Sequence, residues 1–304
     1  MPELPDIQLY LHALRPRVVG KTLQRARIVS PFLVRTFEPT IEAVEGQTVR
    51  ELRRVGKRIV FCFDDELFLV VHLMIAGRFR WSDKAGTKPP GKIGLASFEF
   101  DAGTLMLVES SPKKRASLHV LRGMSALAAM DPGGLNVLEI DLATFAKQVH
   151  LENHTIKRTL TDPRFFDGIG NAYSDEILHA AQLSPVKLTQ RLDYPEIERL
   201  YNATRSTLST WTQRLIAEFG DRFPGPGDVT AFRPDFAVHG KFGKPCPVCG
   251  TLVQRIRFAE NETNYCPRCQ TDGKVLADRS LSRLLKDDWP RSIDEWEGKK
   301  SVHK

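Results

Sequence analysis

Short apolar runs separated by polar turns fill the first 120 residues, whereas helical spacing dominates from about residue 140 to residue 219. Near the start, apolar residues recur at Ile7, Tyr10, Leu11 and Leu14, a spacing that predicts an amphipathic helix ending before Pro16. The runs that follow are rich in β-branched and aromatic residues and are bounded by Asp and Gly, which favours strands. We predict strands over residues 23–30, 58–63, 67–73, 96–100 and 104–108, in an antiparallel sandwich or barrel.

The later periodicity predicts a helical region with recognisable caps. Asp141 is placed to cap a helix through residue 149, Thr155 caps one over 156–160, and a third covers 171–183. Asp193 caps a long helix that ends before Gly220. A Pro- and Gly-rich loop follows over residues 223–227, and the tail carries a short helical pattern at Leu281, Leu284 and Leu285.

Four of the five cysteines form two C-x2-C pairs with sixteen residues between them. Two such turns can converge four thiolates on a tetrahedral ion, and the intervening segment is long enough for a hairpin. A pair of disulfides or a redox C-x-x-C motif would use the same residues, but the double spacing favours one structural Zn²⁺. We predict its ligands as Cys246, Cys249, Cys266 and Cys269, and a buried core position for Cys62.

Composition changes this picture only slightly. The 304 residues include 44 Lys and Arg against 37 Asp and Glu, a net charge of 44 − 37 = +7, and 41% are hydrophobic. A small basic excess favours a polyanionic partner without establishing one, because it is also typical of a solvated surface. The chain has no run of about 18 apolar residues and no basic-then-apolar start, so we expect neither a membrane span nor export.

Position two carries the most unusual chemistry. Removal of Met1 would leave a free secondary amine on Pro2, and an α-amino group has an ordinary pKa near 8. Such an amine can attack an aldehyde-level carbon and give an iminium ion, which remains cationic without a proton and accepts electrons during elimination. Taken alone, Pro2 is more simply one of many prolines that follow a start methionine.

Five motifs that occur in order change that balance. They are the start Met1-Pro-Glu-Leu-Pro-Asp6, the basic strand with Lys57, the segment 72–77, the turn 168–171, and the segment 238–241 that leads into the four cysteines. Together they resemble the formamidopyrimidine-DNA glycosylase/endonuclease VIII family over roughly residues 1–270. The resemblance implies a multidomain α+β fold: an N-terminal β-sandwich with a catalytic N-terminal helix, a helix-two-turn-helix domain and a C-terminal four-Cys zinc ribbon finger. We place the domains at 1–125, 126–236 and 237–271, with a tail over 272–304.

The resemblance also implies roles for single residues. Pro2 matches the family's nucleophile, Glu3 its general acid/base, and Lys57 the lysine beside the lesion. Asn171 matches the residue of a phosphate-binding turn, and His72 matches one that contacts the DNA backbone. From the residues alone, Asn171 is equally a helix cap and His72 an ordinary sheet histidine.

The chain departs from the family pattern near the site. Asp6 stands where the family usually has a Glu, which is one methylene longer. Because the shorter side chain reaches less far toward the flipped nucleotide, Asp6 is a secondary site candidate. Ile75 occupies the position of an apolar wedge that fills the space left by a flipped base. Arg115 stands where an aromatic wedge would be, and it either stacks on a base or joins Lys113 and Lys114 in a phosphate patch.

The finger departs from the pattern as well. Asn261 occupies the position of a fingertip arginine that grips phosphates, and Arg257, with Arg255, is a possible substitute on the preceding strand. These arginines can also be plain solvated charges. Lys157 is a further candidate phosphate contact in the helical region.

The sequence therefore supports two hypotheses. One is a bifunctional DNA glycosylase and abasic-site lyase of base excision repair, acting through a Schiff base on Pro2. The other is a lesion-sensing DNA-binding protein of the same fold with impaired excision, which Arg115 and Asn261 would suit. For both we expect damaged DNA as partner, a monomer, and a cytoplasmic, nucleoid or nuclear location. The preferred lesion and the choice between duplex and single-stranded DNA are not decided by the residues.

Overall fold

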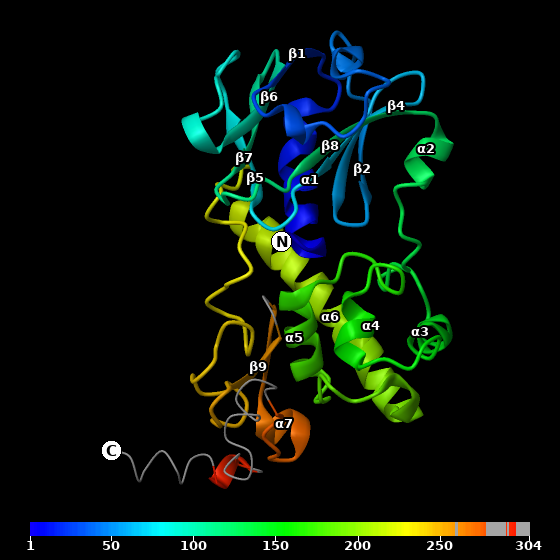
Figure 1. Ribbon diagram of the computed structural model, residues 1–304, viewed down its shortest axis with the longest axis vertical. Coiled ribbons are helices and arrows are strands. Elements are labelled where there is room, and N and C mark those ends of the chain that lie inside the picture. The colour runs from blue at the N-terminus through cyan, green and yellow to red at the C-terminus, as the bar shows by residue number, and fades with distance from the viewer. Residues whose placement is uncertain (259–260, 278–289, 291, 296–304) are drawn as a thin grey trace. The chain divides into compact units, whose positions relative to one another are not determined.

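The computed structural model describes residues 1–258, 261–277, 290 and 292–295 (Figure 1). The chain divides into two compact units. We call residues 1–134 with 210–231 the sandwich unit, and residues 135–209 with the described residues from 232 onward the finger unit. The domain limits at 125, 236 and 271 stay predictions.

The sandwich unit contains two four-stranded antiparallel sheets, with strand orders β1-β6-β7-β5 and β2-β3-β4-β8. Its helices and strands are α1 Leu4–Val18, β1 Leu23–Ile28, β2 Glu51–Val55, β3 Arg58–Cys62, β4 Leu67–His72, β5 Gly77–Ser82, β6 Gly94–Phe100, β7 Gly103–Glu109, β8 Ser117–Arg122 and α2 Met124–Ala128. Short 3-10 turns are η1 Pro31–Leu33, η2 Ile41–Val44 and η3 Gly91–Ile93. Two sheets confirm a sandwich and exclude a closed barrel for these strands.

One apolar core joins both sheets and α1. It includes Phe61 of the second sheet, Phe79 and Leu107 of the first, and Leu14 of the helix, each at most 2% exposed. Leu215 from the end of the long helix completes the same cluster. Burial on this scale stabilises a fold strongly, since each large apolar side chain contributes about 1.5–3 kcal/mol. The later turns of α1 are buried in this core, and they hold the first turn of the same helix in place.

The sequence pattern placed the end of α1 too early and missed three strands. The helix continues through Pro16 to Val18, where the missing proline N–H removes only one bond in the last turn, and Val18 is fully buried. Gly20, with φ +75°, ends the segment. The missed strands are β2, β5 and β8, in which polar and charged residues interrupt the apolar ones.

The finger unit contains helices and one hairpin. Its elements are α3 Leu142–Val149, α4 Ile156–Thr161, α5 Asn171–Ala180, η4 Thr189–Arg191, α6 Tyr194–Phe219, β9 Gln254–Phe258, β10 Asn261–Tyr265 and α7 Pro267–Thr271, with the part of α6 after residue 209 counted in the sandwich unit. Two of the predicted side-chain caps are present: the Asp141 carboxylate accepts from Thr144 N–H at 2.8 Å, and that of Asp193 from Glu196 N–H at 2.8 Å. Thr155 occupies the N-cap position of α4 without a capping hydrogen bond from its side chain. The hairpin of β9 and β10 lies between the two cysteine pairs, as predicted.

Two further predictions concern the C-terminal tail and a membrane-spanning helix. The short helical pattern at Leu281, Leu284 and Leu285 falls outside the described residues. Among the residues that the structure does describe, no helix combines the length and the apolar character needed to cross a membrane.

Candidate active site and metal centre

The first turn of α1 brings two carboxylates to the start of the chain. Pro2 is buried, and Glu3 and Asp6 are each only 3% exposed. The carboxylate of Asp6 accepts a hydrogen bond from the Glu3 backbone N–H at 2.9 Å, in the manner of a capping box. The short side chain of Asp6 thus holds the backbone of the predicted acid/base, whereas its role toward DNA stays a prediction.

Charges of both signs surround the start of the chain. Burial lowers the pKa of the Met1 amino group, and the carboxylates of Glu3 and Asp6 oppose this effect. The cations Arg78 and Lys57 act in the same direction as burial. These surroundings therefore favour the neutral form of the Met1 amino group.

The wedge candidate Ile75 lies on a constrained turn between β4 and β5. Met74 has a φ of +54°, which is rare for a residue other than glycine. Gly77 closes the turn with its N–H on the Leu73 carbonyl at 2.9 Å, and a Cβ at Gly77 would come within 2.2 Å of that oxygen. The turn holds Ile75 outward, with 53% of its surface exposed.

Arg78 links this turn to the loop after α6. Its Nε donates to the Val229 carbonyl at 2.6 Å, and its Nη1 donates to the carbonyls of Ile75 at 3.1 Å and Gly77 at 2.7 Å. Sequence reasoning did not single out Arg78. The alternation of Arg78 and Arg80 with buried Phe79 was the signal that could have found it.

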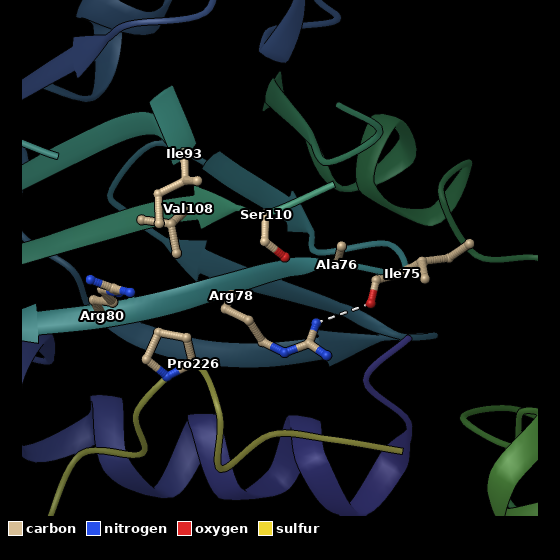
Figure 2. Close-up of a pocket in the computed structure, with 8 residues that line it drawn as sticks. All are labelled: Ile75, Ala76, Arg78, Arg80, Ile93, Val108, Ser110 and Pro226. Carbon is tan, nitrogen blue, oxygen red and sulfur yellow. Dashed lines mark hydrogen bonds between the residues drawn. The ribbon is translucent and has the colours of Figure 1, made fainter. Parts of the chain in front are cut away.

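Figure 2 shows the pocket that Arg78 borders, whose volume is about 210 Å³. Arg80 also lines it, and its Nε is buried with no hydrogen-bond partner in the described structure. The rest of the lining is Ile75, Ala76, Ile93, Val108, Ser110 and Pro226. The lining therefore combines apolar side chains with two arginines and one serine.

The loop over residues 110–116 is held by a buried carboxylate. Glu109 is 1% exposed, and its side chain accepts from the backbone N–H groups of Arg115 at 2.9 Å and Ala116 at 3.0 Å. Lys114 donates from Nζ to the Glu109 carbonyl, whereas the side chains of Lys113 and Arg115 are exposed. Both the stacking role and the phosphate role of Arg115 stay predictions.

His72 ends β4 opposite Arg58 of β3. Burial, together with Arg58, Lys57 and His119, lowers the pKa of His72 to about 4. At neutral pH this side chain is uncharged, so its predicted contact with the DNA backbone would be a neutral hydrogen bond and not an ion pair.

In the finger unit, Asn171 begins α5 and reaches the finger hairpin. Its Nδ2 donates to the Glu262 carbonyl of β10 at 2.9 Å. Lys157 of α4 forms an ion pair with fully buried Asp175 of α5 and also donates to the Asn171 carbonyl at 3.2 Å. The predicted phosphate contacts of Asn171 and Lys157 stay predictions, and Lys157 would have to leave a buried ion pair to make one.

The segment leading into the finger is bound by α5 as well. The carboxylate of Glu176 accepts from the backbone N–H groups of residues 237, 238 and 239 at 2.7, 3.0 and 2.8 Å. Asp175 lies 2.7 Å from Nδ1 of His239 and accepts from the Asn264 N–H at 3.1 Å. These two carboxylates were not identified from the sequence.

The four cysteines of the finger lie together. Their Sγ atoms are all within 4.8 Å of one another, with 3.9 Å between Cys246 and Cys269 and 3.4 Å between Cys249 and Cys266. Zn–S bonds of about 2.3 Å in a tetrahedron require sulfurs about 3.8 Å apart. All five cysteines are free thiols, so the disulfide alternative is excluded. The site fits one structural Zn²⁺, whose four thiolates would leave no position for a substrate.

The remaining finger candidates lie on the hairpin. Arg257 and Arg255 both approach the Glu262 carboxylate, at 3.3 and 3.2 Å, and Arg257 is the more exposed of the two. Asn261 begins β10, and its side chain lies outside the described part of the structure. Cys62 is buried as predicted, and burial raises the pKa of its thiol to about 11.

Comparison with known proteins agrees with this architecture along the chain. Residues 1–115 match the formamidopyrimidine-DNA glycosylase N-terminal domain, residues 133–214 its H2TH domain, and residues 243–271 the zinc finger found in FPG and IleRS. A formamidopyrimidine-DNA glycosylase of Symbiobacterium thermophilum is 29% identical over 288 residues, which are 92% of this chain and 93% of that protein. An uncharacterized formamidopyrimidine-DNA glycosylase-like protein of Mycobacterium tuberculosis is 41% identical over 160 residues, 52% of this chain and 95% of that protein.

Solved structures agree as well. The MutM (Fpg) protein of Thermus thermophilus is 29% identical, with a TM-score of 0.74 over 88% of this chain and 98% of that chain. The Fpg of Lactococcus lactis in complex with abasic-site DNA is 25% identical, with a TM-score of 0.77 over 88% of this chain and 99% of that chain. The sandwich, the helices and the four-cysteine finger thus recur together, and the chain belongs to the formamidopyrimidine-DNA glycosylase family.

Proposed function

We propose that this protein is a bifunctional DNA glycosylase and abasic-site lyase of base excision repair, with damaged DNA as its substrate. The observation that carries the proposal is the buried start of α1, where Pro2 is followed by Glu3 and the Asp6 carboxylate accepts a hydrogen bond from the Glu3 backbone N–H. A relative named formamidopyrimidine-DNA glycosylase matches 92% of the chain, and the L. lactis Fpg was solved in complex with abasic-site DNA.

The residues support a stepwise mechanism. After hydrolytic removal of Met1, the Pro2 nitrogen bonds to deoxyribose C1′ as the damaged base departs with its bonding electrons. Glu3 supplies the proton that opens the sugar ring, which leaves an iminium ion between the nitrogen and C1′. Loss of a proton from C2′ then expels the 3′ phosphate, with the iminium as electron acceptor. Water finally hydrolyses the iminium and releases Pro2.

Other residues bind and position the DNA in this proposal. Lys57 contacts the lesion phosphate, and Ile75 fills the space of the flipped nucleotide, while Asn171 and the arginines of the finger contact the backbone. The zinc finger would hold its shape through the four cysteines and take no part in bond breaking. We propose that the protein acts as a monomer.

Borohydride trapping on abasic-site DNA tests the proposal. Reduction of the iminium joins protein to DNA, so the wild-type protein, with Met1 removal checked by intact mass, should give a stable adduct. Pro2→Gly should lose nearly all of it, and Glu3→Gln should slow its formation by about 10²–10⁴-fold. Pro16→Ala, a proline change at the far end of the same helix, serves as the matched control and should trap like wild type.

The same assay separates the second hypothesis. Tight binding to abasic-site DNA without any adduct would refute lyase activity and favour a lesion-sensing DNA-binding protein. The departures at Arg115 and Asn261 are the observations that keep this alternative in view.

A further inference from the structure

One face of α5 carries polar side chains toward the finger. Asn171, Asp175 and His179 follow one another at intervals of four residues and therefore share a face of the helix. Asn171 and Asp175 contact β10, as described above. His179 continues this stripe one turn further, near the end of α5.

His179 meets a cysteine of the predicted zinc site. Its Nε2 lies 3.2 Å from Sγ of Cys246, and the two residues are only 7% and 2% exposed. Water therefore has little access to compete for the contact. Glu176, on the preceding turn of α5, holds the backbone of residues 237–239, so the approach of the helix to this segment is fixed independently.

The chemistry of the two atoms decides which one donates. A zinc-bound cysteine is a thiolate, which can only accept a hydrogen bond. A neutral imidazole carries one N–H, so the tautomer with the proton on Nε2 suits this contact. Since four cysteines already complete a tetrahedral shell, His179 acts beside the shell and not as a ligand.

We propose that His179 is an outer-shell positioning residue of the zinc site, donating a hydrogen bond from Nε2 to Sγ of Cys246 and so increasing the retention of Zn²⁺. Outer-shell donors fix the orientation of a ligand and disperse its charge, and their loss costs about 10–100-fold in metal affinity. The proposal concerns the finger alone and does not depend on glycosylase activity.

A matched pair of substitutions tests it. His179→Phe keeps a planar ring and removes the donor, whereas His179→Gln retains an N–H group near the position of Nε2. Zinc affinity of the full-length protein is measured by competition with a chromophoric chelator. We expect His179→Phe to bind Zn²⁺ about 10–100-fold more weakly and His179→Gln to stay close to wild type.

The outcomes are distinct. Wild-type affinity in His179→Phe would overturn the proposal, and so would equal losses in both variants, because packing and not the donor would then be responsible. If His179→Phe does not fold, His179→Ala replaces it as the variant without a donor, and its Co²⁺-substituted form is compared with Co²⁺-substituted wild type and His179→Gln by the sulfur-to-cobalt charge-transfer band. A band shifted in His179→Ala and retained in His179→Gln supports the hydrogen bond, and an identical band in all three proteins overturns it.

Discussion

In the sandwich unit, the candidate catalytic residues occupy the first turn of a helix whose remaining turns are buried among two sheets. In the finger unit, the residues that hold the finger are buried charged and polar groups, among them Asp175 and Glu176. Among its described residues, the finger has a small apolar cluster formed by Val238, Cys246, Val253 and Cys266. A module of this size lacks the apolar area needed for independent stability, so metal binding and buried polar contacts must replace it.

The start of α1 and the finger should therefore differ in how much stability a single substitution removes. Apolar burial is spread over many side chains, so the start of α1 does not depend on one contact. The finger depends on Asp175 and Glu176, each of which accepts several hydrogen bonds. A buried charge that loses its partner is costly, which makes these positions the most vulnerable ones in the finger unit.

The largest expected effect follows from this. Asp175→Asn leaves the Lys157 ammonium buried without its counterion, and we expect a loss of about 3–5 kcal/mol in the stability of α5 and the hairpin. Hydrogen exchange of the α5 and β10 amides measures that local stability. The control is Asp162→Asn, whose partner Arg164 is well exposed and whose ion pair should contribute less than about 1 kcal/mol. Equal protection in the two variants would break the comparison.

The contrast also explains what the sequence could predict. The cysteine pairs could be predicted because they follow a known spacing, and Pro2 and Glu3 became candidates because the first residues of the chain resemble a family motif. Arg78 was missed because its partner Val229 is 151 positions away. Asp175 and Glu176 were missed for the same reason, although the spacing of four residues places Asp175 on one face of the helix with Asn171.

A second, somewhat smaller effect concerns pH and the sandwich unit. The pKa of His72 is about 4 in the folded protein and near 6.5 in an unfolded chain, so between these values the unfolded chain binds more protons. Stability should therefore rise from pH 4 to pH 6.5 and be lost as the pH falls, with His72 contributing on the order of 3 kcal/mol.

Denaturant unfolding of wild type and His72→Gln at several pH values measures this contribution. The substitution removes the titrating group, so the dependence on pH between 4 and 6.5 should become shallower in the variant. If the free energy of unfolding depends on pH in the same way in both proteins, the proton uptake belongs to other groups. His119 is one such group, because burial lowers its pKa as well.

The smallest effect tests whether the catalytic turn really depends less on a single polar contact. Asp6→Ala removes the acceptor for the Glu3 N–H, which is worth about 1 kcal/mol at a helix start, whereas Asp6→Asn keeps an oxygen in place and should be nearly neutral. The free energy of unfolding measures the stability, and borohydride trapping reports whether Glu3 has moved. A loss as large as that of Asp175→Asn would mean that a buried polar contact dominates in both units, because the apolar core behind α1 would then not be holding its first turn.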